Sequence, residues 1–79
     1  MNIQILYFGQ IADRIGLSAE NFDWTSGLLV STLREQILAK YPILKDQIFK
    51  IAVNQKIMQE DMPIPFPAEI ACLPPFAGG

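Results

Sequence analysis

The sequence predicts an α+β domain in which a mixed sheet packs against one main helix. Three patterns in its 79 residues support this prediction: an alternating run that opens the chain, an apolar period of helical spacing near the middle, and an apolar strand-like run before the C-terminus. Apolar residues make up 51% of the chain and charged residues 18%. One core can therefore form in a chain of this length without a metal or disulfides.

The first expected strand spans residues 2–8 and ends at Gly9. Its alternate positions form two sets, which are Ile3, Ile5 and Tyr7 against Gln4, Leu6 and Phe8. Residues 10–18 are expected to form a connection with room for one helical turn. Residues 19–24 form a second expected strand, because the turn signal Thr25-Ser26-Gly27 follows them.

A helix is expected next, because apolar residues recur three and four positions apart while charged and amide side chains occupy the other side. The apolar positions are Val30, Leu33, Ile37, Leu38 and Tyr41. Pro42 ends this helix, since the residue before a proline avoids the α-helical conformation. Short strands are expected at 51–53, 56–58 and 69–73, with a turn at 54–55 and a proline-rich loop at 62–67.

The order β-β-α-β-β-β predicts a β-grasp, or ubiquitin-like, arrangement. The first and last strands lie side by side and parallel at the centre of the sheet. Residues 1–73 form this domain, and residues 74–79 form an extended C-terminal tail. The side chains expected to face the helix from the two central strands are Ile3, Ile5, Tyr7, Ile70 and Cys72.

The opposite face of the two central strands begins with polar residues and ends with apolar ones. Strand alternation sends Leu6, Phe8, Ala71 and Leu73 to that face. An exposed apolar patch of this kind marks a surface for a partner. The alternative is that residues 9–18 or Met62 fold over the patch and bury it.

The chain ends Leu73-Pro74-Pro75-Phe76-Ala77-Gly78-Gly79. Two prolines favour an extended geometry that holds the tail away from the body. Two terminal glycines leave a carboxylate that can pass through a narrow channel where a Cβ atom would clash. The six residues after Leu73 could reach roughly 20 Å. The alternative is an ordinary disordered, glycine-rich chain end.

The composition excludes most autonomous enzymes. There is no histidine, and Cys72 is the single cysteine, so neither a catalytic triad nor a Cys/His zinc site can form. Cys72 alternates with apolar residues and is interpreted as a small core residue. A net charge of −2 argues against nucleic acid, and no apolar run is long enough to span a bilayer. We expect a soluble, cytoplasmic carrier, substrate or adaptor that binds no metal.

Several segments together resemble the small subunit of molybdopterin synthase, the MoaD family of sulfur carriers. They are the opening Ile5-Leu6-Tyr7-Phe8-Gly9-Gln10, the mid-chain Ala52-Val53-Asn54-Gln55 and the ending Pro74-Pro75-Phe76-Ala77-Gly78-Gly79. The likeness covers essentially the whole chain. One departure is Leu28-Leu29 before the helix, where the family often has a Thr or Ser cap; it leaves the start of the helix open.

This resemblance implies that the chain binds no cofactor itself. A ubiquitin-activating-type enzyme would use ATP and magnesium to convert the Gly79 carboxylate into an acyl-adenylate. A sulfur donor protein would then leave a thiocarboxylate on Gly79. That sulfur would enter the active site of the large synthase subunit and attack cyclic pyranopterin monophosphate. The usual assembly would contain two small and two large subunits.

The resemblance also implies a role for each tail residue. Gly79 carries the reacting group, and Gly78 lets the tail pass the constriction. The remaining tail positions would set its direction and fill the partner's channel; these are Pro74, Pro75, Phe76 and Ala77. The expected interface residues on the sheet are Phe8, Leu73, Leu6 and Ile57.

Three other functions remain open from the sequence. One is another ubiquitin-like sulfur carrier, serving thiazole or tungsten-cofactor synthesis, although thiazole carriers are usually shorter and lack the two prolines. The second is a ubiquitin-like modifier that forms isopeptide bonds with lysines. The third is an interaction module whose Gly-Gly ending has no chemical role.

Overall fold

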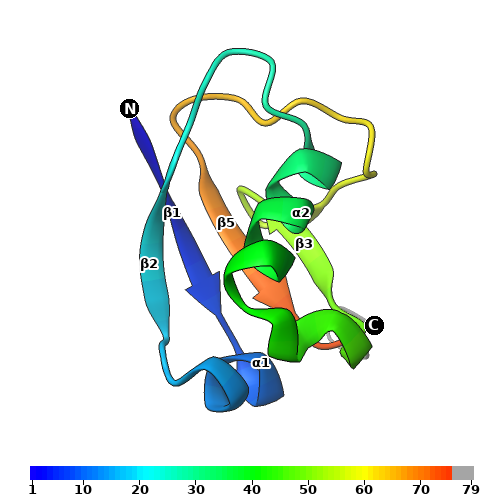
Figure 1. The fold of residues 1–79 in the computed structure, drawn as a ribbon. Coiled ribbons are helices and arrows are strands. Elements are labelled where there is room, and N and C mark those ends of the chain that lie inside the picture. Colours follow the sequence, from blue (N-terminus) through cyan, green and yellow to red (C-terminus); the bar gives the residue numbers. More distant parts are fainter. Residues whose placement is uncertain (76–79) are drawn as a thin grey trace.

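A computed structural model of the chain describes residues 1–75, and its ribbon shows helix α2 lying across one face of a single sheet (Figure 1). The sheet has five strands in the order β2-β1-β5-β3-β4. The elements are β1 (Asn2–Tyr7), α1 (Gly9–Ile15), β2 (Ala19–Asp23), α2 (Val30–Lys40), the 3-10 helix η1 (Pro42–Asp46), β3 (Lys50–Val53), β4 (Lys56–Ile57) and β5 (Glu69–Leu73). The predicted β-grasp architecture is confirmed.

The first and last strands form the centre of the sheet. In Figure 1 the arrows of β1 and β5 lie side by side and point toward α1. Their pairing is parallel, with Ile5 opposite Ile70 and Tyr7 opposite Cys72. The outer pairs β1–β2, β3–β5 and β3–β4 are antiparallel. The chain therefore leaves the sheet from a central strand that has a neighbour on each side.

The core lies between α2 and the sheet. Leu33 and Ile37 of α2 are fully buried and belong to the same apolar cluster as the inward residues of the central strands. All five strand residues expected there are at most 2% exposed: Ile3, Ile5, Tyr7, Ile70 and Cys72. The period-two pattern thus identified the core-facing side correctly.

The connection after β1 differs from the prediction. It holds a seven-residue helix, α1, where room for one turn was expected. Ile11 of α1 is fully buried, and Ala12 and Ile15 pack against the core cluster. These three positions are spaced like one face of a helix, but polar residues between them and the nearby Gly16 weaken the signal. The 3-10 helix η1 after Pro42 was also not predicted.

The N-terminus of α2 explains how the helix begins without a Ser or Thr cap. Leu29 is the N-cap residue and makes no side-chain cap bond. The amides of Val30 and Ser31 instead donate to the carbonyl oxygens of Met62 and Glu60, at 3.0 and 2.9 Å. The loop after β4 therefore satisfies donors that a helix otherwise leaves free.

That loop is held in place by a bidentate ion pair. The Arg34 guanidinium of α2 donates to both carboxylate oxygens of Glu60, at 2.8 and 3.0 Å. A third guanidinium nitrogen donates to the carbonyl of Phe49 at 2.8 Å. Two-point binding of a planar guanidinium fixes orientation as well as distance, so α2, the loop and the start of β3 are tied together.

A second polar cluster ties the edge strand β2 to the end of α2. The Glu20 carboxylate accepts hydrogen bonds from Tyr7 and Lys40, each at 2.6 Å, and from Tyr41. Burial raises the pKa of Tyr7 well above its ordinary value, and the hydrogen bond to Glu20 raises it further. Tyr7 is therefore a neutral donor to a charged acceptor, which strengthens the bond.

Candidate functional site

A row of apolar residues crosses the sheet on the face opposite α2. Leu6 lies opposite Ala19 on β2 and opposite Ala71 on β5. Ala71 lies opposite Ala52 on β3, and Ala52 opposite Ile57 on β4. Paired residues in a sheet point to the same face, so these side chains from five strands form one continuous apolar row.

The two alanines in this row create a hollow in the face of the sheet opposite α2, which we call the open face. Ala52 and Ala71 are neighbours with short side chains, whereas Leu6 and Ile57 on either side are large. The resulting cavity has a volume of about 470 Å³. It is lined by Leu6, Phe8, Ala52, Gln55, Ile57, Glu69, Ala71 and Leu73. Neither Met62 nor residues 9–18 contribute to this lining, so the patch is not covered in the way considered as its alternative.

The structure brings together all four residues that were expected to form an interface. Phe8 is 44% exposed and Ile57 is 50% exposed, while Leu6 and Leu73 are half-buried. The opposite end of the face is polar, because Gln4 is paired with Glu69. The face therefore becomes apolar toward the end of β5 where the tail begins. The role of these residues in binding a partner stays a prediction.

The root of the tail is Pro74, the first residue of the predicted tail. It is attached to the body of the domain more firmly than expected. Pro74 is buried, whereas Pro75 is exposed. Gly9 adopts a positive φ of 58°, and a Cβ atom at this position would lie 3.0 Å from Cγ of Pro74. The amide of Phe8 also donates to the carbonyl of Cys72 at 3.2 Å. Pro74 was expected to start the extended tail, but it packs on the body next to Gly9.

The remaining tail residues of the prediction are Phe76, Ala77, Gly78 and Gly79, which lie outside the described residues. Pro75 is the last described residue. The predicted tail follows Leu73, which lines the hollow at the apolar end of the open face. Four residues of fully extended chain span at most about 14 Å, so the chain end can reach only points within that distance of Pro75.

Sequence patterns missed Ala52 and Gln55, which line the hollow, and Ile48, which lies just before β3. Ala52 forms the floor of the hollow, and Ile48 is 73% exposed just before β3. Phe49, Ile51 and Val53 face the core, so the alternation that identified β1 would also have placed the residues between them on the open side. Ile48 precedes the short expected strand, and for that reason it was left out of the pattern.

Within residues 1–75, no three His, Cys, Asp or Glu residues form a group that could hold a metal ion. Cys72 is fully buried, and burial raises the pKa of its thiol to about 12 although Arg34 lowers it in part. A thiol with such a pKa remains protonated at neutral pH and is a poor nucleophile. In the same part of the chain, neither helix has the length and apolar character needed to cross a membrane.

Comparison with known proteins gives a consistent result over the full chain. Residues 5–79 match the model of the ThiS family. The molybdopterin synthase sulfur carrier subunit of Chlamydomonas reinhardtii is 31% identical, with all of both chains covered. The subunit of the same name from Caenorhabditis elegans is 28% identical over 100% of this chain and 99% of its own.

Solved structures share the fold. A putative molybdopterin converting factor subunit 1 from Pyrococcus furiosus superposes with a TM-score of 0.86 at 20% identity, covering 95% of this chain and 98% of its own. Small archaeal modifier protein 1 of Haloferax volcanii gives 0.82 at 16% identity with full coverage of both chains. A complex of subunits 1 and 2 of the molybdopterin-converting factor from Helicobacter pylori contains a chain that matches with 0.68 at 24% identity, both fully covered.

These structural likenesses establish the fold, and the matches in sequence establish the family. The predicted resemblance to molybdopterin synthase sulfur carriers is confirmed by relatives of that name that align from end to end. The chain therefore belongs to the ThiS family, whose model matches residues 5–79.

Proposed function

We propose that this chain is the sulfur-carrier subunit of a molybdopterin synthase. Its full-length similarity to sulfur carrier subunits supports the pathway. The observation that carries the mechanism is the place where the tail leaves the sheet: Leu73 lines the apolar hollow, and the predicted tail follows directly after it. A face that binds a partner and an adjacent chain end that enters the partner's active site would together allow a small non-enzymatic domain to deliver a reactive atom.

The reacting group is the carboxylate of Gly79. An activating enzyme would join it to the α-phosphate of ATP and release pyrophosphate, because a carboxylate has no good leaving group of its own. Sulfur supplied by a donor protein at the oxidation level of sulfide would then form a C–S bond to the carbonyl carbon while the C–O bond to AMP breaks and AMP leaves. Magnesium and the activating enzyme would stabilise the developing charge. The product is a thiocarboxylate on Gly79.

Delivery would take place in a second protein. The large synthase subunit would cover the open face, and the thiocarboxylate sulfur would form a C–S bond to cyclic pyranopterin monophosphate inside that subunit while a C–O bond of the substrate breaks. Water would then cleave the resulting thioester, which leaves the sulfur on the product and restores the Gly79 carboxylate. The large subunit would supply the acid–base groups, since this chain has no histidine. Two sulfur atoms are needed for the dithiolene of molybdopterin, so each product would consume the sulfur of two carriers loaded as thiocarboxylates.

The anchored root of the tail supports directed delivery. Pro74 is buried next to Gly9, and β5 has a hydrogen-bonded neighbour on either side. The anchored part of the chain therefore extends through Pro74. A fixed starting point reduces the conformational freedom lost when Gly79 is held at a reaction centre.

Intact-mass measurement tests the proposal directly. The purified chain is incubated with ATP, magnesium, an activating enzyme and sulfide. Replacement of one oxygen by sulfur is expected to add about 16 Da at the C-terminus. A chain lacking Gly78 and Gly79 is the negative control. No mass gain with the cognate activating enzyme would overturn the sulfur-carrier function.

The delivery step separates this function from the alternatives. The loaded carrier, mixed with the large subunit and cyclic pyranopterin monophosphate, is expected to form molybdopterin. Gly78→Ala should load or transfer more slowly while its unfolding free energy stays unchanged, because the added methyl narrows the fit in the channel. Higher-mass conjugates detected with an antibody to the chain would instead favour a protein modifier.

A further inference from the structure

An exposed isoleucine stands beside the root of the tail. Ile48 is 73% exposed, although most large apolar residues before and after it are buried. The pairing of β3 with β5 ends where Lys50 lies opposite Leu73. Ile48 and Pro75 are the residues two positions beyond this last pair on the two segments. Each is therefore roughly 7 Å of chain from a paired residue, so Ile48 borders the place where the tail leaves the sheet.

The segment that carries Ile48 is fixed on the core side. Phe49 is 4% exposed and lies under the Arg34 guanidinium, 4.6 Å from the ring centroid. Its carbonyl accepts a hydrogen bond from the same guanidinium at 2.8 Å. Residue 48 thus precedes an anchored residue and does not belong to a long free loop.

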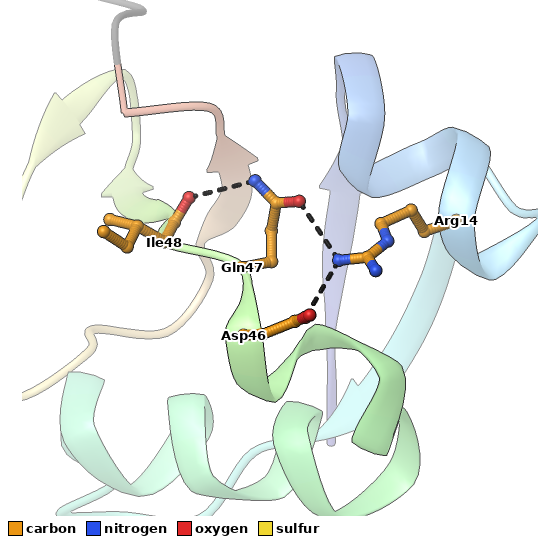
Figure 2. Close-up of polar contacts among 4 residues, drawn as sticks. All are labelled: Arg14, Asp46, Gln47 and Ile48. Carbon is orange, nitrogen blue, oxygen red and sulfur yellow. Dashed lines mark hydrogen bonds and ion pairs between the residues drawn. The ribbon is translucent and has the colours of Figure 1, made fainter.

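A polar bridge fixes the same segment from the side of α1. Figure 2 shows Arg14 reaching from α1 to Asp46 and Gln47 at the end of η1, with the Ile48 side chain directed away from them. One guanidinium nitrogen donates to Asp46 Oδ1 at 3.1 Å and to Gln47 Oε1 at 3.3 Å. The side-chain Nε2 of Gln47 donates to the backbone carbonyl of Ile48 at 3.4 Å. The bridge is exposed, so it stabilises the fold little, but it links α1 to the residues on the N-terminal side of Ile48.

The length of the tail limits how far away a partner can remain. Four residues follow Pro75, and they span at most about 14 Å when fully extended. A pocket that takes up the Gly79 carboxyl group must lie inside this distance. A protein that encloses such a pocket must therefore approach the surface around Pro75, which Ile48 borders.

From these observations we infer that Ile48 is a contact residue for the protein that receives the tail. This inference rests on the proposed function, and the partner in question is the large synthase subunit. Ile48 would add an apolar contact at the end of the sheet where Lys50 pairs with Leu73, which also lines the hollow. Burying it would exclude water from the entrance of the channel, and the hydrogen bonds at Ile48 and Phe49 limit the conformational entropy lost on binding.

A pair of charge-neutral substitutions of an apolar by a polar side chain tests the inference. Ile48→Gln removes an apolar side chain beside the tail root, and Met62→Gln removes a 42% exposed one in the loop before β5. Affinity of each full-length variant for the purified large subunit is measured by titration calorimetry. We expect Ile48→Gln to bind about tenfold more weakly than the unaltered chain, Met62→Gln to bind equally well, and Ile48→Leu to remain within about twofold.

The outcomes separate this inference from the proposed function. If the unaltered chain binds the large subunit and Ile48→Gln binds as tightly as Met62→Gln, the contact is refuted and the sulfur-carrier function stands. If the unaltered chain does not bind at all, both are overturned. If sedimentation shows a dimer of the free chain that Ile48→Gln dissociates, Ile48 contacts a second copy and the inference is wrong. Urea unfolding of each variant checks that the fold is retained.

Discussion

Replacement of Gly9 by alanine is expected to disturb sulfur delivery by way of the tail root. Gly9 has a φ of 58°, a conformation that costs a residue with a Cβ atom about 1–2 kcal/mol. The new Cβ would also lie 3.0 Å from Cγ of Pro74. Carbon atoms prefer separations of about 3.5–4.0 Å, so the buried proline ring would have to move.

Gly16→Ala is the matched control for this substitution. Gly16 has a similar φ of 77°, but a Cβ atom there would meet no atom within 4 Å. Both variants should lose about 1–2 kcal/mol through backbone strain, and Gly9→Ala should lose more through its contact with Pro74. In a domain of this size each kcal/mol lowers the melting temperature by about 4–8 °C. Thermal and urea unfolding measure the difference.

The functional consequence should be specific to Gly9. A small rotation at Pro74 displaces every later tail residue, and misplacement of a reacting group by about 1 Å can lower a rate about 100-fold. We expect single-turnover sulfur transfer from the loaded carrier to fall at least about tenfold for Gly9→Ala and to stay unchanged for Gly16→Ala. Equal stability losses together with unchanged transfer in both variants would refute the role assigned to the Gly9–Pro74 contact.

Three further predictions follow from the described contacts. Phe8→Ala should weaken binding of the large subunit about tenfold, whereas Leu17→Ala, at a residue of similar exposure, should leave calorimetric affinity unchanged; equal affinities would contradict the assigned face. Burial alone would raise the pKa of Glu20, but hydrogen bonds from Lys40, Tyr41 and Tyr7 outweigh it and lower this pKa below its ordinary value of 4.5. The stability that Glu20 contributes should therefore be complete above that value and lost as pH falls through the lowered pKa, and Glu20→Gln should remove this part of the acid dependence in urea titrations. Cys72, whose pKa burial raises to about 12, should resist alkylation at neutral pH until urea unfolds the chain; rapid labelling of the folded protein would show that the thiol is accessible.

The local pattern of the sequence was sufficient for the central part of the fold. Ile3, Ile5 and Tyr7 are buried and alternate with less buried positions, and alternation depends only on neighbouring residues in an extended chain. The turn at Asn54-Gln55 was likewise correct, and both residues have positive φ, as a tight hairpin requires. The α1 helix was underestimated because its short apolar face is interrupted and no cap residue marks its start.

The start of α2 shows why some features could not be predicted. No side chain caps this helix, so a search for Ser or Thr before it finds nothing. Its free amides bind carbonyl oxygens of Glu60 and Met62, which lie about thirty residues further along the chain. Backbone carbonyls are the same in every residue type, so their use as a cap leaves no signature in the sequence.

The candidate site was likewise predicted from the sequence only in part. The two prolines and two glycines of the tail are read directly from the sequence, and strand alternation predicts the apolar ends of β1 and β5. The sequence alone therefore predicted a docking face beside a chain end that is delivered to a partner. The hollow between Ala52 and Ala71, the seat of Pro74 on Gly9 and the position of Ile48 depended on the tertiary structure. These features arise from the register between strands that are far apart in the chain, and register is set by how all the strands and α2 pack together.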